Sequence, residues 1–171
     1  MHTNFPIVIS NYDFDNTVLN GKTKPYKIFH KGQSKIGVFG IGIELKGLVP
    51  KELYKETVYM DPIKAANKYA EILKKEENCD LVICLSHLGY KYDDDFVSDV
   101  ILAENSRNID IIIGGHTHTF MYEPDIRKDL DDNEVIINQA GWAGIMLGRL
   151  DVFIEKNKKG KCVSCKNTYV S

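Results

Sequence analysis

Residues Ile109–His118 read IDIIIGGHTH, and this stretch gives the clearest indication of the fold. The isoleucine-rich run 109–113 predicts a strand buried on both faces, because its apolar residues show no regular polar alternation. Two glycines follow where that strand ends, so the backbone can bend there or approach a ligand closely. In an extended segment His116 and His118 point to the same side. Two imidazoles at the carboxyl end of a strand indicate a metal site, although ordinary loop histidines near a sheet edge also fit.

The composition is that of an ordinary globular domain. The 171 residues are 43% hydrophobic and 27% charged, which excludes a disordered chain and allows one domain over 1–171. Lys and Arg number 22 against 24 for Asp and Glu, so the basic excess typical of binding to a nucleic-acid polymer is missing. No apolar run reaches the roughly 18 residues that a membrane span requires. We therefore expect no nucleic-acid polymer as partner and no membrane span.

The N-terminus and the cysteines leave the compartment open. Met1–Pro6 lacks the charged region and long apolar stretch of a signal peptide, so no signal peptide is expected. Cys162 and Cys165 have the CxxC spacing, but a zinc site needs a second such pair and a redox motif needs a helix start after a strand. We interpret this pair as part of a plain strand or turn.

Apolar runs and turn residues predict the order of the elements. Asp61-Pro62 begins a helix that closes at Lys74-Lys75, and Asp93–Asp95 is interpreted as the first turn of a second helix. The charged segment 127–134 is expected to be an exposed loop or hairpin turn, and 156–161 a basic turn. The middle of the chain is then a β-α-β-α-β series with parallel strands, followed by an antiparallel tail. Strands are expected at 6–10, 80–86, 109–113, 135–138, 145–155 and 162–170, with a hairpin from 26–31 and 35–43.

Parallel strands place three histidines at one edge of the predicted sheet. His87 follows strand 80–86, and the other two histidines follow strand 109–113. One helix joins these strands, so their carboxyl ends share the edge where open α/β sheets bind ligands. His87, His116 and His118 are therefore the candidate metal ligands, with zinc or manganese as the ions suited to an imidazole-rich hydrolytic site. Phe120 and Trp142 lie near this site in sequence, and packing is a better interpretation for both than stacking on a base.

The same residues carry a resemblance to a known family. SHLG at 86–89 and GGHTH at 114–118 resemble two signature blocks of the calcineurin-like metallophosphoesterases. More narrowly, they resemble the 5′-nucleotidase branch, which includes the 2′,3′-cyclic phosphodiesterases. The segments 5–11, 139–141 and 147–151 match that branch in order and spacing. The resemblance covers essentially the whole chain and implies an α/β fold: part of a four-layer α/β/β/α sandwich with mixed parallel and antiparallel strands.

The resemblance also implies a reaction, the hydrolysis of nucleotides or other phosphate esters by metal-activated water. The family uses two divalent ions bridged by an aspartate, and such paired ions sit roughly 3.5–4 Å apart. By resemblance, His87 and His116 would bind one ion and His118 the other. No substrate-binding residue is identified. Full-length relatives are expected to be periplasmic or on the cell surface.

Other parts of the family pattern do not occur in the sequence. The Asp-x-His, Gly-Asp and Gly-Asn-His-Asp/Glu blocks would supply the remaining ligands, the bridging aspartate and a catalytic histidine. The family's C-terminal nucleotide-recognition domain is also missing. We expect a catalytic domain without its N-terminal metal-binding half, holding no catalytic residue and one metal ion or none. Three neutral imidazoles can hold one zinc, but two dications need an anionic bridge.

An incomplete domain has consequences for activity and assembly. We expect little or no phosphatase activity from the chain alone, and self-association through the open sheet edge that missing strands would leave. Two other hypotheses stay open: a non-catalytic metal-binding or interaction module that keeps the fold, and a self-contained hydrolase with one metal ion on three histidines. The substrate is not decided by the fold.

Overall fold

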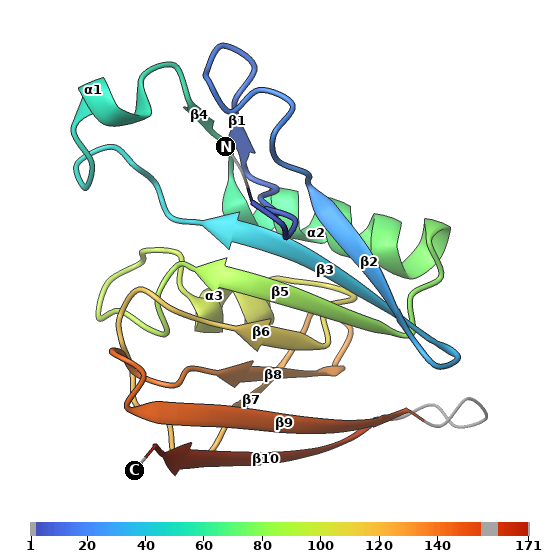
Figure 1. The fold of residues 1–171 in the computed structure, drawn as a ribbon. Helices are drawn as coiled ribbons and strands as arrows, with labels where there is room; N and C mark the ends of the chain where they lie inside the picture. The colour runs from blue at the N-terminus through green and yellow to red at the C-terminus, as the bar shows by residue number, and fades with distance from the viewer. Residues whose placement is uncertain (1–2, 155–160, 171) are drawn as a thin grey trace.

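A six-stranded mixed sheet forms the centre of the computed structural model, which describes residues 3–154 and 161–170 (Figure 1). The strand order is β2-β3-β5-β6-β8-β7. The four inner strands run parallel to one another, and β2 and β7 pair antiparallel at the two edges. The strands are β2 (Tyr26–Lys31), β3 (Ser34–Gly42), β5 (Leu81–His87), β6 (Ile111–Ile113), β7 (Asp125–Lys128) and β8 (Glu134–Asn138).

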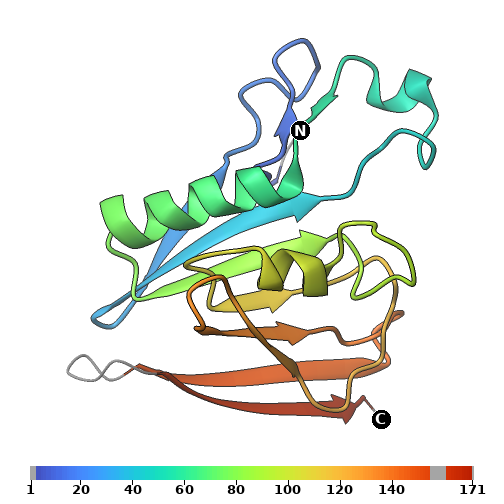
Figure 2. The ribbon, with the colours of Figure 1, turned by 180° about the vertical axis from the view of Figure 1, so that it is seen from behind.

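Two helices cover one face of this sheet, as Figure 2 shows. Helix α2 (Pro62–Glu71) begins where the Asp61 side chain accepts a hydrogen bond from the Lys64 N–H, and it continues into a π-helical turn, η1 (Ile72–Glu76). Helix α3 (Asp99–Glu104) is capped by Ser98. The main core lies between the helices and the sheet, and its fully buried members include Phe39, Ala66, Leu73, Val82, Cys84, Leu102, Ile112 and Ile137.

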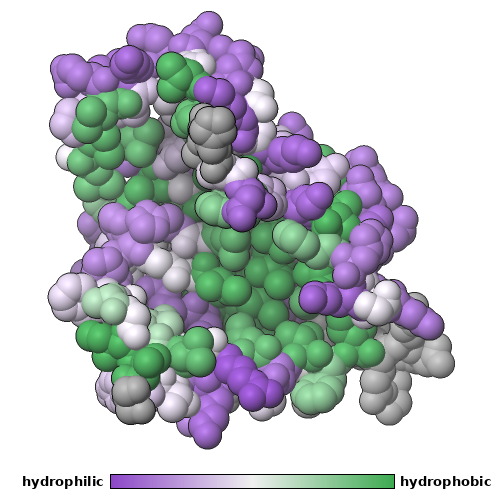
Figure 3. Space-filling view, viewed as in Figure 1, coloured by the Kyte–Doolittle hydropathy of each residue, from purple (hydrophilic) through white to green (hydrophobic). Residues whose placement is uncertain are grey.

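A hairpin of β9 (Met146–Ile154) and β10 (Lys161–Tyr169) packs on the opposite face of the sheet. The β9 side chains Leu150, Val152 and Ile154 contact a second, smaller cluster made by Leu81, Ile111 and Ile136. Beyond this contact the same face stays open: Leu85 of β5 and Ile113 of β6 are about two-fifths exposed, at 41% and 43%. Figure 3 shows a continuous apolar area over these middle strands. The layers are therefore helices, a six-stranded sheet and a two-stranded sheet that covers part of the far face.

A smaller unit lies beyond the β3 side of the sheet. β1 (Tyr12–Asp13) and β4 (Val58–Tyr59) form a two-stranded antiparallel sheet, and the short helix α1 (Lys51–Tyr54) lies beside it (Figure 1). The Asn11 side chain ties this unit to the end of β3, because it both donates to and accepts from the backbone of Gly42. Within the residues that the structure describes, no helix is long and apolar enough to cross a bilayer.

Most of the predicted elements are confirmed. The hairpin of β2 and β3, the helix that begins after Asp61 and the parallel pairing of β5 with β6 all occur as expected. The mixed α/β class with parallel and antiparallel strands is also correct. The Cys162–Cys165 segment lies within β10, in agreement with a plain strand. The basic turn predicted at 156–161 falls mainly outside the described residues.

Three local predictions were wrong. Residues 6–10 form only an isolated bridge, because this segment crosses the end of β3 instead of joining the sheet: the Ser10 N–H bonds to the Gly40 carbonyl. The second helix begins at Asp99, because the Ser98 side chain caps it and the Asp99 N–H bonds to the Gly89 carbonyl. Asp93–Asp95 therefore precede the helix.

The third correction concerns the tail. The hairpin turn predicted for 127–134 does occur, because this segment joins the antiparallel strands β7 and β8, in which Lys128 pairs with Glu134. The tail is not wholly antiparallel, however. β8 pairs parallel with β6, because the chain first forms the antiparallel edge strand β7 and then returns between the two. Sequence periodicity gives no information about which neighbour such a strand will choose.

The core contact between η1 and β3 can be tested by truncation. Leu73 is fully buried and fits over Gly37, where an added Cβ would lie 2.8 Å from the leucine Cδ2. We expect Leu73→Ala to lower the free energy of unfolding by about 2–5 kcal/mol, as measured by urea denaturation. Leu53→Ala on the exposed α1 is the matched control and should stay within about 0.5 kcal/mol of wild type. Equal losses in both variants would contradict this packing.

Candidate functional site

The ends of β5 and β6 bring two histidines from separate parts of the chain together. His87 is the last residue of β5, and His116 follows β6 after two glycines. Their ring centroids are 5.1 Å apart with the rings at 69° to each other. Gly115 makes this approach possible, since a Cβ at that position would lie 3.3 Å from His87 Nδ1. The carboxyl edge of the parallel strands therefore holds an imidazole pair, as the sequence predicted.

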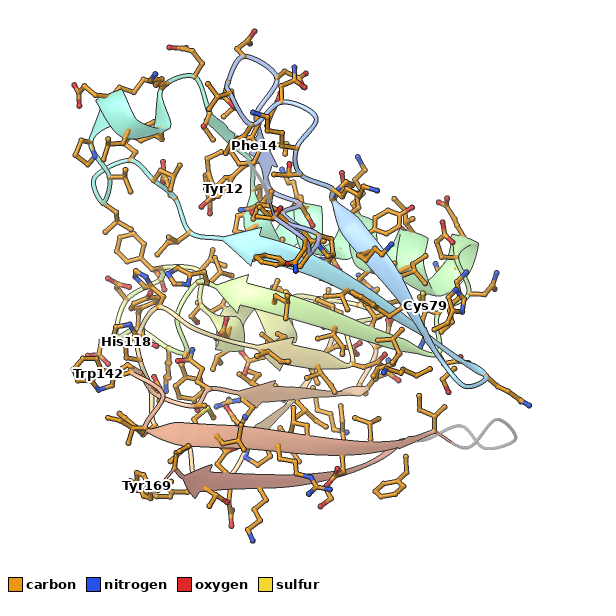
Figure 4. The ribbon with its side chains drawn as sticks, in the orientation of Figure 1. Tyr12, Phe14, Cys79, His118, Trp142 and Tyr169 are labelled. Carbon is orange, nitrogen blue, oxygen red and sulfur yellow. The ribbon has the colours of Figure 1, made fainter. Side chains whose placement is uncertain are left out.

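The segment that carries the other two histidines is not extended. His116 and His118 both adopt left-handed backbone conformations, with φ of 72° and 54°. The expectation that their side chains would share one side of an extended strand was therefore wrong. The His118 ring instead stacks on Trp142, with 6.1 Å between centroids and 12° between planes. Figure 4 shows these two side chains together at the carboxyl edge of the sheet, far from Cys79 at the opposite end.

The surroundings of His87 favour its neutral imidazole form. Burial lowers the pKa of His87, and the neighbouring His116 and His118 act in the same direction. Neutral imidazole is the form that binds divalent metals, so the donor chemistry fits zinc or manganese. Across residues 3–154 and 161–170, no three His, Cys, Asp or Glu side chains lie close enough together to hold a metal ion. The described residues thus offer an imidazole pair with a third imidazole nearby, but no cluster of three ligands.

Two clefts meet at His116. One, of about 580 Å³, lies between the Val8–Tyr12 segment and the ends of β3 and β5, and His87 also lines it. The other, of about 650 Å³, is lined by aromatic and aliphatic side chains that include Tyr59, Tyr92 and Phe96. One hollow therefore adjoins both imidazoles and the other adjoins His116, which gives a ligand access to the pair.

Two buried polar side chains that the sequence interpretation did not single out lie behind the histidines. Gln139 follows β8 and is 2% exposed, and Asp99 opens α3 and is fully buried. The Gln139 Nε2 donates to Asp99 Oδ2 and to the Gly115 carbonyl, both at 3.0 Å. Gln139 lies in the 139–141 segment already noted for its family resemblance, and Asp99 directly follows a capping serine. These two features were the signals that the sequence offered, and neither indicates that Gln139 contacts Asp99.

The buried Asp99 carboxyl has an unusual protonation equilibrium. Burial raises its pKa from the ordinary 3.8 to about 6, while hydrogen bonds from Ser86 and Gln139 act in the opposite direction. Its Oδ1 atom has no hydrogen-bond partner of ordinary geometry. A carboxylate without full hydrogen bonding is costly in an apolar interior, so the protonated form gains relative stability there.

Comparison with known proteins agrees with this geometry. A family model described as calcineurin-like phosphoesterase matches residues 5–120. An apyrase of Tabanus yao is 33% identical over 156 residues, which cover 86% of this chain and 26% of that protein. The trifunctional nucleotide phosphoesterase YfkN of Bacillus subtilis is 29% identical, over 89% of this chain and 11% of its own length. The chain thus spans well under a third of these relatives.

Solved structures show the same fold. A 5′-nucleotidase precursor from Thermus thermophilus superposes with a TM-score of 0.80 and 23% identity, over 96% of this chain and 34% of that one. The NAD nucleotidase of Haemophilus influenzae gives a TM-score of 0.78 with 21% identity, over 98% of this chain and 35% of its own. At these identities the match establishes the fold alone. The described strands and helices therefore correspond to part of a larger domain architecture.

The protonation of Asp99 predicts how stability depends on pH. The folded state keeps this proton up to pH of about 6 and the unfolded state loses it near 3.8, so stability should fall as pH rises through this interval. The interval of about two pH units corresponds to about 3 kcal/mol. Asp99→Asn removes the titration, and its free energy of unfolding should lose this decline in urea titrations from pH 3.5 to 7.5. Asp131→Asn, at a half-exposed side chain, is the control. If the free energy of unfolding of Asp99→Asn declined with pH as the wild type does, Asp99 would not be the group responsible for the decline.

Proposed function

We propose that this chain, which belongs to the calcineurin-like phosphoesterase family, forms the histidine side of a 5′-nucleotidase-type metal centre that hydrolyses nucleotides or related phosphate esters. The observation that carries the proposal is the contact of His87 with His116 at the carboxyl edge of β5 and β6. The family match over residues 5–120 includes both histidines. Their neutral imidazoles would share one zinc or manganese ion, and His118 would serve a second ion beside it.

The chain's own contribution is to hold ligands in place and to leave room for substrate. A divalent ion at such a site supplies Lewis acidity and acidifies water. The sheet fixes His87 through the regular pairing of β5 with β3 and β6. The loop after β6 fixes His116, and the two clefts beside it leave space for a phosphate ester. Under this proposal, anionic ligands would come from a segment outside the described residues or from another chain, because the described residues form no cluster of three potential ligands.

The uncovered face of the sheet also supports the proposal that ligands from elsewhere complete the metal centre. Side chains alternate along a strand, so His87 shares a face of β5 with Leu85 and Ile83. This is the face that the β9–β10 hairpin covers only in part. Within the described residues β9 pairs only with β10, so its other edge offers free backbone groups to a further strand. Additional strands on this face would complete the second sheet and lie next to the histidines.

A second candidate is a metal-binding or interaction module without catalysis. The observation in its favour is the lack of a three-ligand cluster among the described residues. Both candidates use the same histidines, and they differ in whether added anionic ligands produce phosphatase activity. We expect little or no activity from this chain alone under either candidate, so metal binding is the more informative measurement.

Metal binding should depend on the imidazole pair. We expect His87→Ala to weaken Mn²⁺ or Zn²⁺ binding in calorimetry by more than the roughly 10- to 100-fold typical of losing an outer-shell partner, because a ligand itself is removed. His30→Ala, on the exposed end of β2, is the control and should bind as wild type does. Equal affinity in wild type and His87→Ala would contradict the proposed site.

The open face should also cause self-association. We expect the purified chain to form dimers or larger species, because apolar side chains and a free strand edge remain uncovered. Leu85→Lys places a charge in the middle of this face and should lower the mass measured by light scattering toward that of a monomer. Leu53→Lys, on the exposed helix α1, should leave the mass unchanged. A wild-type chain that stays monomeric at high concentration would contradict this expectation.

A further inference from the structure

The Gln139 side chain uses all of its hydrogen-bonding capacity on the segment that carries the histidines and on Asp99. Its Nε2 donates to the Gly115 carbonyl and to Asp99 Oδ2, both at 3.0 Å. Its Oε1 accepts from the Thr119 N–H at 3.1 Å and from the Thr117 hydroxyl at 3.3 Å. A primary amide has two donor hydrogens and two acceptor positions, so no capacity remains.

These bonds reach both ends of a five-residue segment, Gly115–Thr119, which we call the histidine loop. Gly115 precedes His116, and Thr119 follows His118. Both histidines have left-handed backbone conformations, which are strained for residues other than glycine and persist only when surrounding contacts hold them. The loop contains no regular secondary structure and has few backbone hydrogen bonds, such as those from the Thr117 N–H to the Gly115 carbonyl and from the Gly141 N–H to the Thr119 carbonyl, so the side-chain contacts add to its support.

Asp99 anchors the amide from the other side. It is the first residue of α3, fully buried, and its backbone is fixed by the bond from its N–H to the Gly89 carbonyl. Gly114 shows how closely this group lies against the loop, because an added Cβ there would be 2.0 Å from Asp99 Oδ2 and 2.7 Å from Gln139 Nε2. Helix α3, the end of β8 and the loop after β6 therefore meet at one buried amide.

We propose that Gln139 is a positioning residue for the metal-binding histidines, with Asp99 as its anchor. The amide holds the two ends of the histidine loop at a fixed separation, which sets where the His116 and His118 imidazoles lie relative to His87. The inference rests on the proposed function, because it assigns Gln139 a purpose at that same metal site. A purely structural amide would instead stabilise the fold without any particular effect on the histidines.

The test compares metal affinity with stability in matched variants. Gln139→Met keeps the length of the side chain and removes all four bonds, and we expect it to weaken Mn²⁺ binding by about 10- to 100-fold in calorimetry. The control is Asp129→Ala. Asp129 is equally buried, at 6% exposed, and its carboxylate accepts from the Asp131 and Asn133 N–H groups in the turn before β8, at the opposite end of that strand. The control should lower Tm while leaving the Mn²⁺ affinity unchanged.

A rescue experiment separates positioning from a general loss of stability. Gln139→Glu keeps the acceptor toward Thr119 but turns the donor into a carboxylate oxygen that faces Asp99 and the Gly115 carbonyl. Asp99→Asn in the same chain provides an amide that can donate to this glutamate. We expect the double variant to bind Mn²⁺ at least about threefold more tightly than Gln139→Glu alone, as coupled neighbours do.

Hydrogen exchange keeps the inference testable whatever the metal result. In Gln139→Met we expect faster exchange of the Thr117 and Thr119 amides, with β5 amides unchanged. If wild type binds no Mn²⁺ but this local change occurs, the proposed metal site fails and the positioning of the loop stands. Wild-type affinity and wild-type exchange in Gln139→Met would overturn the inference. An equal loss of affinity in Asp129→Ala would also overturn it, since any loss of stability would then suffice.

Discussion

The parallel pairing of β5 with β6 brings His87 and His116 to one edge of the sheet. Ile83 pairs with Ile111 and Leu85 with Ile113, so β6 ends opposite Leu85 while β5 continues to His87. Helix α3 lies between them in the chain, and a βαβ connection has one favoured hand. The residues that follow two neighbouring parallel strands therefore lie at the same edge of the sheet. The imidazole pair is thus a consequence of backbone pairing together with the small residues that follow β6.

The apolar face beside this pair links the fold to the proposed chemistry. In a finished two-sheet domain both inner faces are covered, yet Leu85 and Ile113 remain partly exposed next to the histidines. The chain spans 26% and 11% of the two relatives described above, and about a third of the two solved chains. The described residues contain no three-ligand cluster at this edge, and the uncovered apolar surface lies beside the same histidines. Under the proposed function one explanation would cover both, namely further strands packed on this face.

The sequence predicted the sheet-level features because they depend on local patterns. The apolar runs around Ile83 and Ile112 indicate buried strands, and Asp61-Pro62 is a clear helix start. The start of α3 was missed because it depends on a tertiary bond to the Gly89 carbonyl as well as on the Ser98 cap. The carboxylates of Asp93–Asp95 favoured an earlier helix start. The sequence pattern did not indicate that Ser98 is the cap.

The sequence predicted the functional site to the same extent as it predicted the fold. His87 and His116 follow from strand order, whereas the stacking of His118 on Trp142 depends on left-handed backbone angles that residue type does not specify. Gln139 is 20 or more residues from each of its loop partners, so only the folded chain shows what it holds. Sequence patterns therefore indicate the histidines at strand ends, whereas the contacts of Gln139 and Asp99 with the loop are visible only in the folded chain.

X-ray absorption at the zinc edge tests the central claim most directly, because it reports the atoms bound to the ion without requiring turnover. With one equivalent of Zn²⁺ added to the chain, the proposed site predicts imidazole scattering with Zn–N distances of about 2.0–2.1 Å. This scattering should decrease in His116→Ala and remain in His30→Ala. A spectrum with only oxygen ligands, or one unchanged by His116→Ala, would contradict a metal site on His87 and His116.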